Sequence, residues 1–310
     1  MPDRDHVTVL LPTYDEAATI GSVVDDFREA GFDDILVMDG GSTDGTQEIA
    51  QNRGARVETQ STIGKGQAVR EAVRDHIDRE YVLMADGDGT YLAEQADEML
   101  APLDDGYEHV IGNRFADMKG GAMTTLNQVG NSMTNWFFSS IHGQPFEDIL
   151  SGYRAFTRDS FLQFTLSADG FGIETEMAVE CAKRDIPTAV VPITYLERPA
   201  GSNTNLHPIK DGGIIFLELF RRAKTSNPLF YFGSVGLASG LLGTILALYV
   251  LIEWFVYTVP HQVIAIASAG AVLLGVQLLM FGVLSDLILT LHREQLEHLE
   301  NLAVKHGNDD

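Results

Sequence analysis

YVLMADGDGTY, residues 81–91, runs from an apolar segment straight into two aspartates, Asp86 and Asp88, each followed by a glycine. Asp and Gly are common turn residues, so the segment could be only a polar turn after a strand. Alternatively, a strand that ends in two carboxylates can bring both to the carboxyl edge of a parallel sheet, where open α/β folds bind ligands. Carboxylate oxygens suit Mg²⁺ or Mn²⁺, and Mg²⁺ commonly takes one or two carboxylates plus substrate phosphates.

Strand and helix patterns alternate on both sides of this stretch, from residue 6 to about residue 115. Strands are expected at 7–13, 34–39, 56–60, 81–86 and 109–115, and helices at about 16–30, 44–54 and 64–77. Such alternation predicts a mostly parallel sheet built from βαβ units. No Gly-x-Gly-x-x-Gly follows the first strand, which disfavours a dinucleotide-dependent dehydrogenase. The strand ends PTYDE, DGGSTDGT and DGDGT should meet along one edge, which favours a ligand site over a plain turn.

The composition limits the classes of partner. The chain has 310 residues, 44 acidic and 21 basic, for a net charge of −23. This balance disfavours nucleic-acid binding, which needs a basic surface. It favours adaptation to molar salt, where charge repulsion is screened, over an ordinary acidic enzyme. The single cysteine, Cys181, excludes an intramolecular disulfide and is expected to pack in a helix.

The C-terminal third contains two long apolar segments, 229–250 and 263–289, and each can cross a bilayer. The connection between them has no Lys or Arg, whereas Arg221, Arg222 and Lys224 precede the first segment and Arg293 follows the second. The positive-inside rule therefore predicts a multi-pass protein of the cell membrane with its N-terminal domain and both termini in the cytoplasm. No signal peptide is expected at the N-terminus. Gly236 and Gly240 predict close packing of the two spans.

These patterns predict four parts. Residues 1–208 form the soluble domain, 209–226 an amphipathic helix in the membrane interface, 227–290 two transmembrane helices and 291–310 a cytoplasmic tail. The alternative for 209–226 is a buried helix of the soluble domain.

Seven motifs carry a family resemblance. In order and spacing, LLPTYDEAATI, VMDGGSTDGT, GKGQAVREA, MADGDGT and VIGNRF resemble family 2 glycosyltransferases of the GT-A fold, and DILSGYRAF and FGIETEMAVECAKRDI extend the match. The chain looks like the dolichyl-phosphate mannosyl- and glucosyltransferase branch, in its membrane-anchored archaeal form. The resemblance covers roughly residues 6–206. It implies an α/β fold with a Rossmann-like, mostly parallel sheet, followed by an interfacial helix and two transmembrane helices.

The resemblance assigns a nucleotide-binding set consisting of Pro12, Tyr14, Glu16, Asp39, Lys65 and Asp86. Tyr14 would stack on the base and Glu16 would reach the ribose. Asp39 would face the nucleoside, although DGGS at 39–42 lacks the second acidic residue that the family often has. Lys65 opens a predicted helix, whose N–H groups favour an anion, and would approach the diphosphate.

The opening stretch matches the family's Asp-x-Asp signature. The resemblance implies that Asp88, with Asp86 beside it, ligates Mg²⁺ or Mn²⁺. It also implies a lipid-phosphate set consisting of Arg114, Ser151, Arg154 and Arg198, because arginine forks fit phosphate oxygens. For Arg154 a structural salt bridge is the alternative. Asp148 is expected to orient a group or act as a secondary base, which completes a catalytic set of Asp86, Asp88, Arg114, Asp148 and Arg198.

Glu174 and Glu176 are expected to cap a helix, and His142 is assigned no chemistry. The family lysine after Arg-x-x-Gly is missing; Asn205 is the nearest counterpart and Lys210 a possible replacement.

The predicted function is inverting transfer of a hexose from a nucleoside diphosphate sugar to dolichyl phosphate, as the first step of lipid-linked glycan assembly for protein N-glycosylation. UDP-glucose is favoured over GDP-mannose as the donor. The alternatives are a GDP-mannose-dependent mannose synthase, a processive polysaccharide synthase and a membrane adaptor without turnover. The synthase is disfavoured because Gln-x-x-Arg-Trp is absent, and the adaptor because the Asp-x-Asp pair is intact.

Overall fold

The computed structural model describes residues 2–168, 170, 172–199, 213, 220, 224 and 227–307. The chain divides into two compact units, Met1–Phe216 and Leu217–Asp310. The predicted interfacial helix at 209–226 falls almost entirely on residues outside this description, as do Asn205 and Lys210. The bounds of the four predicted parts stay predictions.

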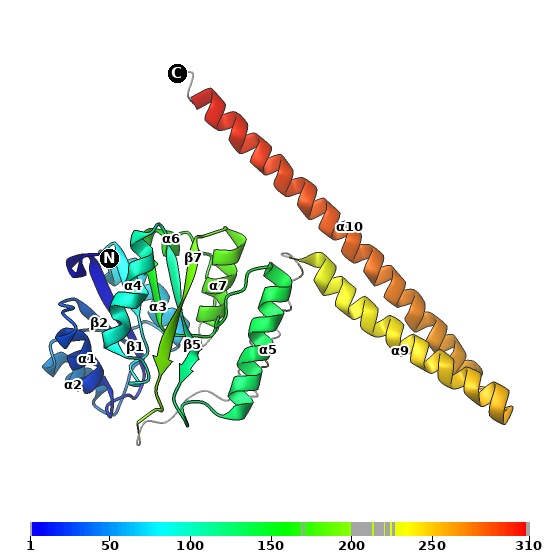
Figure 1. Ribbon diagram of the computed structural model, residues 1–310, viewed down its shortest axis with the longest axis horizontal. Helices are drawn as coiled ribbons and strands as arrows, with labels where there is room; N and C mark the ends of the chain where they lie inside the picture. The colour runs from blue at the N-terminus through cyan, green and yellow to red at the C-terminus, as the bar shows by residue number, and fades with distance from the viewer. Residues whose placement is uncertain are drawn as a thin grey trace. The chain divides into compact units, whose positions relative to one another are not determined.

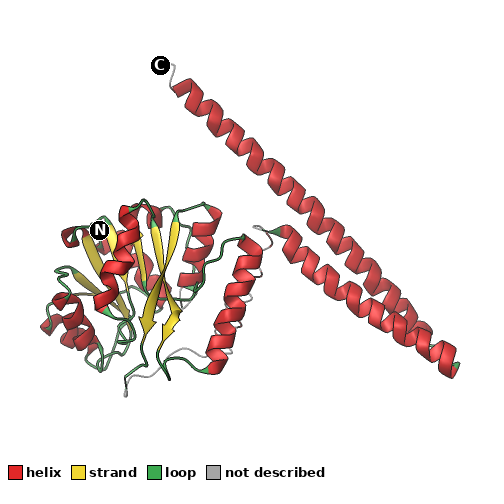
Figure 2. Cartoon of the chain, viewed as in Figure 1, coloured by secondary structure: helices red, strands yellow, loops and turns green. Residues whose placement is uncertain are grey.

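The N-terminal unit is built on one seven-stranded sheet (Figures 1 and 2). Its strands, in chain order, are β1 (Val7–Thr13), β2 (Ile35–Asp39), β3 (Arg56–Thr59), β4 (Tyr81–Met84), β5 (His109–Met118), β6 (Arg154–Thr157) and β7 (Thr188–Tyr195). Their order across the sheet is β3-β2-β1-β4-β6-β5-β7. All pairs are parallel except those of β6, which runs antiparallel to β4 and β5. The predicted fold class is confirmed, with β6 as the strand that makes the sheet mixed.

A short turn precedes the first strand, and helices and further turns connect the strands. They are η1 (Arg4–His6), α1 (Ile20–Glu29), α2 (Thr46–Asn52), α3 (Lys65–Glu71), η2 (Ala72–His76, a π-helical turn), η3 (Ala93–Gln95), α4 (Ala96–Asp104), α5 (Thr125–His142), α6 (Arg158–Leu162) and α7 (Ile173–Lys183). The first helix begins at Ile20 and not near residue 16 as predicted. The reason is that the preceding loop pairs with the loop after β2: Asp15 N donates to Ser42 Oγ at 2.8 Å, and Glu16 N donates to Thr46 Oγ1 at 2.9 Å.

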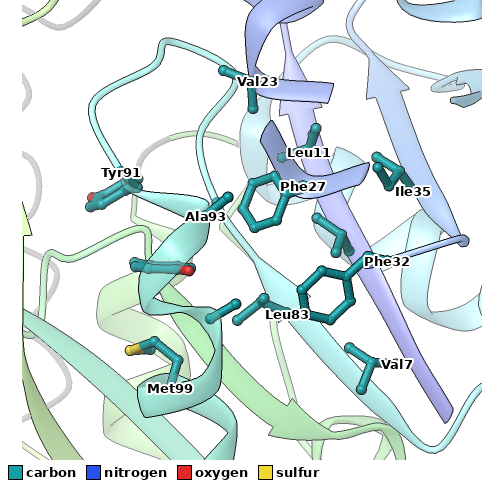
Figure 3. Packing of buried hydrophobic residues seen from close by; sticks show 14 of the residues in the cluster. Val7, Leu11, Val23, Phe27, Phe32, Ile35, Leu83, Tyr91, Ala93 and Met99 are labelled. Carbon is teal, nitrogen blue, oxygen red and sulfur yellow. The ribbon is translucent and has the colours of Figure 1, made fainter. Parts of the chain in front are cut away.

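The core lies between the sheet and the helices that cover it (Figure 3). Phe27 of α1 and Phe32 meet edge to face, with ring centroids 6.1 Å apart, over the fully buried Leu83 of β4. Burying large apolar side chains is the main favourable term in folding. This packing fixes β1, β2 and β4 side by side, and the ends of these strands carry the candidate site.

In the described part of the C-terminal unit the chain forms two long helices, α9 (Pro228–Tyr257) and α10 (Gln262–Gly307). Pro228–Tyr257 and Gln262–Leu291 are long and apolar enough to cross a membrane, with mean hydropathies of 2.2 and 2.3. Most of their large apolar side chains are exposed, unlike those of a core helix in a soluble protein. Glycines allow the helices to pack closely: a Cβ on Gly236 would lie 2.7 Å from Gly275 O. Ser239 and Ser268 also donate hydrogen bonds to carbonyls of the opposite helix.

Candidate active site

The carboxylate of Asp39 organises the loop that follows β2. It is fully buried, and its two oxygens accept hydrogen bonds from Gly41 N, Ser42 N, Ser42 Oγ, Gln47 Nε2 and Thr13 Oγ1, at 2.6–3.3 Å. A buried carboxylate is stable when its lone pairs are satisfied in this way. Asp39 therefore holds the loop in shape, and its predicted contact with a nucleoside stays a prediction.

Two more aspartates join this loop to the loop after β1. Ala17 N donates to Asp44 Oδ2 at 3.0 Å, and Thr43 N donates to Asp15 Oδ1 at 2.9 Å. Hydrogen bonding to backbone and side-chain donors keeps the pKa of Asp44 below its usual value, against the raising effect of its burial. The paired loops fix the positions of Tyr14 and Glu16 beyond the buried Pro12 of β1.

Gln60 lies beside this pair of loops and was not singled out from the sequence. A Cβ on Gly40 would be 3.0 Å from Tyr14 Cδ2 and 3.3 Å from Gln60 Nε2, so these two side chains flank the glycine. Gln60 is only 9% exposed, and its Oε1 has no hydrogen-bond partner among the described residues. A buried amide oxygen without a partner is costly, which marks it as a group that a ligand can satisfy. Its position just after β3 was the only sequence signal that could have drawn attention to it.

Asp88 is buried in the turn after β4. Its Oδ1 accepts hydrogen bonds from Thr90 N at 3.1 Å and Thr90 Oγ1 at 2.6 Å, and its Oδ2 is paired with Arg198 Nη2. Arg198 Nη1 also lies 3.6 Å from Glu16 Oε1. Burial alone would lower the pKa of Arg198, but the charges of Asp88 and Glu16 outweigh it and raise that pKa. The structure thus brings together three predicted residues from distant parts of the chain.

Asp86 is paired with Lys65 at the start of α3. Lys65 Nζ lies 2.5 Å from Asp86 Oδ1 and 2.5 Å from Glu174 Oε1 on α7. Burial would lower the pKa of Lys65, but the two carboxylates raise it well above its usual value, so this amine stays charged. The prediction that Glu174 is a helix cap is corrected, because its buried carboxylate serves Lys65. Glu176 has a structural role, accepting hydrogen bonds from Ser167 N, Ser167 Oγ and Ala168 N.

The glycines around the two aspartates are explained by close approach. A Cβ on Gly87 would lie 2.6 Å from Thr13 Cγ2, and a Cβ on Gly152 would lie 2.6 Å from Asp86 Oδ2. Gly89 has a φ of 75°, which favours glycine. The DGDG sequence therefore lets the chain turn sharply against β1 while the loop before β6 closes over Asp86.

Arg114 lies on β5, between β6 and β7 in the sheet, and is committed to Asp148. Its Nε and Nη2 donate to the two carboxylate oxygens at 2.7 and 2.8 Å, and its backbone N donates to Oδ2 at 3.1 Å. Both residues are buried, and the guanidinium lies over the ring of Tyr195, 5.3 Å from its centroid. The pKa of Arg114 is raised well above its usual value because Asp148 outweighs the lowering effect of burial. The predicted contact of Arg114 with a phosphate would have to compete with this two-bond pair.

Arg154 and Ser151 lie inside the unit, where they hold the loop before β6. Arg154 is fully buried and donates to Ile149 O at 2.7 Å and Ser151 O at 3.0 Å, with its Nη1 3.0 Å from His109 Nε2. Ser151 is also fully buried, and its Oγ accepts from Tyr153 N at 3.3 Å. These positions do not support direct contact with an acceptor by either residue. The alternative of a salt bridge for Arg154 is also wrong in detail, because its described partners are carbonyls and a histidine.

The two aspartates fit a divalent metal as part of a shared coordination sphere. No group of three His, Cys, Asp or Glu side chains able to hold a metal is found among the described residues. Asp86 and Asp88 offer hard carboxylate oxygens, the type that Mg²⁺ and Mn²⁺ prefer, and such ions often take the remaining ligands from substrate phosphates and water. The residues present therefore fit a metal that arrives with a diphosphate, and do not form a complete protein-only site.

Comparison with known proteins agrees with this geometry. The sequence profile of Glycosyl transferase family 2 matches residues 8–163. Glycosyltransferase AglJ of Haloferax volcanii is 67% identical over 97% of this chain and 100% of its own length. A dolichyl-phosphate hexose transferase of the same organism is 36% identical over 68% of this chain and 91% of its own length.

A solved structure shares the fold. Glucosyl-3-phosphoglycerate synthase from Mycobacterium tuberculosis, in complex with Mn²⁺, UDP-glucose and phosphoglyceric acid, superposes with a TM-score of 0.58 at 22% identity, covering 70% of this chain and 79% of that chain. The mixed sheet, the aspartates after β4 and the family match lead to one conclusion: the chain is a glycosyltransferase and belongs to Glycosyl transferase family 2.

Proposed function

We propose that this glycosyltransferase moves a hexose, with glucose favoured, from a nucleoside diphosphate sugar to dolichyl phosphate at the cytoplasmic face of the cell membrane. The product would be the first intermediate of lipid-linked glycan assembly for protein N-glycosylation. The observation that carries the proposal is the turn after β4, where two carboxylates are each paired with a cation, Asp86 with Lys65 and Asp88 with Arg198. The two apolar C-terminal helices and the dolichyl-phosphate hexose transferase relative support a lipid acceptor.

In the proposed reaction, an oxygen of the acceptor phosphate forms a bond to C1 of the sugar on the face opposite the leaving group. The bond between C1 and the diphosphate oxygen breaks, and the nucleoside diphosphate leaves with the electron pair. The acceptor phosphate is already an anion near neutral pH, so no strong general base is required. Asp148 is therefore better suited to orienting Arg114, to which it is bonded, than to removing a proton.

The charges of the site suit a diphosphate. Asp86 and Asp88 would hold Mg²⁺ or Mn²⁺, which neutralises charge on the departing diphosphate. The solved neighbour that binds UDP-glucose was crystallised with Mn²⁺, which supports the same class of ion here. Lys65 and Arg198 stay protonated and can exchange a carboxylate for a phosphate oxygen. We assign Lys65 to the donor diphosphate and Arg198 to the acceptor phosphate.

Recognition of the base falls on Tyr14 and Gln60. Tyr14 directly follows the carboxyl end of β1, and its exposed aromatic ring can stack on a base. The Gln60 amide offers an acceptor and a donor side by side, which match the N3–H and a carbonyl of uracil. With Gly40 in place of an acidic residue, this amide takes over hydrogen bonding to the base.

The test measures sugar transfer by the purified full chain in lipid vesicles that contain dolichyl phosphate. Labelled UDP-glucose, UDP-galactose and GDP-mannose are supplied as donors in parallel reactions. The proposal expects label in the lipid extract from UDP-glucose, dependent on Mg²⁺ or Mn²⁺. Label from GDP-mannose alone would identify a mannose synthase and withdraw the assignment of Gln60 to uracil. If no donor gives lipid-linked label although nucleotide binding is intact, the proposal that dolichyl phosphate is the acceptor would be contradicted.

A further inference from the structure

Helix α5 exposes a row of large apolar side chains. Leu126, Val129, Met133 and Trp136 are 59%, 52%, 62% and 68% exposed. They are spaced by three, four and three residues, which places them on one face of an α-helix. Phe137, Phe138 and Ile141 form the buried face of the same helix. The helix is therefore apolar on two sides, although the described residues of the unit cover only one of them.

The helix also lacks charge. None of its 18 residues is Asp, Glu, Lys or Arg, in a chain that has 44 acidic and 21 basic residues. Elsewhere in the unit the exposed sides of helices are rich in charge, as in α1 with Asp25, Asp26 and Glu29. A water-exposed helix of an acidic protein needs such charges for solubility. Their absence indicates that this face meets something other than water.

We propose that α5 lies on the membrane surface, with the face formed by Leu126, Val129, Met133 and Trp136 seated among the lipid headgroups. With the two candidate spans in a bilayer, a lipid surface would always be within reach of the N-terminal unit. Tryptophan is enriched at the membrane interface, and apolar helix faces bind there through the area that they bury. A face without carboxylates is also not repelled by anionic headgroups, unlike the rest of this acidic surface.

The seated helix would support the part of the site assigned to the acceptor. Asn135 on α5 donates from Nδ2 to Glu147 O at 2.7 Å and accepts at Oδ1 from Ile149 N at 3.0 Å. Asp148 lies between these two residues and pairs with Arg114. Two hydrogen bonds thus join the proposed lipid-contacting helix to the loop that orients Arg114. Contact with lipid would hold this loop close to the surface from which a lipid phosphate arrives.

Trp136 itself provides the test, because the chain has only two tryptophans and the other, Trp254, can be removed as Trp254→Phe. The full-length variant is reconstituted at high salt into vesicles whose lipids carry bromine at shallow acyl positions. Bromine quenches tryptophan only at short range, so we expect Trp136 to lose at least about half of its fluorescence relative to unbrominated vesicles. The matched control is Tyr107→Trp in a chain with Trp136→Phe and Trp254→Phe. Its reporter is exposed on the turn after α4 and should be unaffected.

A second variant tests whether the other apolar residues of this face hold Trp136 in the lipid. Val129→Glu with Met133→Glu adds two charges at exposed positions, and Trp136 should then lose most of its quenching. Equal quenching of Trp136 and of the control Trp at position 107 would overturn the proposal. A blue-shifted Trp136 emission without bromine quenching would overturn it in favour of cover by another segment of the chain. Emission that changes with the protein-to-lipid ratio, again without quenching, would overturn it in favour of a second copy. None of these readouts depends on sugar transfer.

Discussion

Asp88 and Arg198 couple the two halves of the proposed reaction at the level of single residues. Asp88 Oδ2 pairs with Arg198, which also approaches Glu16. The charge of this guanidinium is shared between two carboxylates, and it would be free to bind an ionised phosphate if Asp88 instead held a metal. Under the proposed function, Arg198 would exchange its carboxylate partner for the acceptor phosphate during the reaction.

Replacing Arg198 with alanine should weaken use of the acceptor. A charge-assisted hydrogen bond to an ionised phosphate contributes about 1.5–3 kcal/mol. The KM for dolichyl phosphate should then rise about tenfold to a hundredfold, while nucleotide-sugar affinity stays nearly constant. Lysine should rescue only in part, because it keeps the charge and loses the fork. Acceptor titration beside donor calorimetry separates the two sides, with Arg53→Ala as a control arginine on the surface. Lost donor affinity with an unchanged acceptor KM would move Arg198 to the diphosphate.

Gln60→Glu should change the preference for the base. A carboxylate offers two acceptors, which repel the carbonyls of uracil but match the adjacent N1–H and N2–H donors of guanine. We expect the affinity for UDP to fall at least about tenfold and the ratio of UDP to GDP affinity to fall further. Gln60→Leu should lower the affinity for UDP without raising the affinity for GDP. Calorimetry with both nucleotides measures this, and Gln51→Glu on the exposed side of α2 controls for added charge. Unchanged affinities in a folded variant would remove Gln60 from the base site.

Sequence patterns located some of these residues and not others. Asp86 and Asp88 stand out because an apolar strand ends directly at them and because they match a family signature. The pairing of Lys65 with Glu174 and the open amide of Gln60 arise only when distant segments fold together, so no local pattern predicts that pairing or that open amide. Arg114 and Arg154 show the reverse case. Their type suggested phosphate binding, whereas their burial gives them partners within the protein.

At the scale of elements, the strands that alternate with helices were predictable because each carries a short apolar run bounded by turn residues. The antiparallel β6 was not, since its four residues, RAFT, say nothing about direction. The start of α1 was displaced by hydrogen bonds from the loop after β2, which replace the first helical turn. Where the local sequence preference was weak, tertiary contacts thus determined the strand direction or the helix start.

Helix α5 ends at a histidine that should make the fold sensitive to acid. Burial, with a smaller contribution from the charge of Lys183, lowers the pKa of His142 to about 4. The unfolded chain has a histidine pKa of about 6.5. Between pH 6.5 and 4 the unfolded state therefore binds a proton that the folded state does not. The free energy of unfolding then falls as the pH is lowered through this range. His142→Phe keeps the aromatic contact with Phe138 and should reduce this fall.

Urea unfolding of the full chain in micelles, at pH 7, 5.5 and 4.5, measures the effect. Exposed His6→Phe serves as the control for adding a phenyl ring. The same loss of stability with pH in His142→Phe and in the parent would show that this imidazole does not carry the effect.

For the whole molecule, the excess of 44 acidic over 21 basic residues predicts a dependence on salt. The Debye length grows from about 3 Å at 1 M to about 10 Å at 0.1 M, so repulsion between carboxylates rises as salt is diluted. The thermal midpoint should fall on dilution from 3 M to 0.2 M KCl. The triple variant Asp33→Lys, Glu94→Lys, Asp105→Lys changes exposed positions and should fall less. If the thermal midpoint falls equally in the parent and in the triple variant, the salt dependence comes from general salting-out and not from repulsion between carboxylates.

The central claim is that the carboxylates after β4 support transfer of a hexose to a polyprenyl phosphate. The most direct measurement is mass spectrometry of the lipid fraction after the full chain in vesicles has been incubated with UDP-glucose, dolichyl phosphate and Mn²⁺. The account predicts dolichyl phosphate heavier by one hexose. It predicts at least about a hundredfold less product from Asp88→Asn or in the presence of a chelator, since both remove metal coordination from the diphosphate. Undiminished product from folded Asp88→Asn, with chelator present, would contradict the claim.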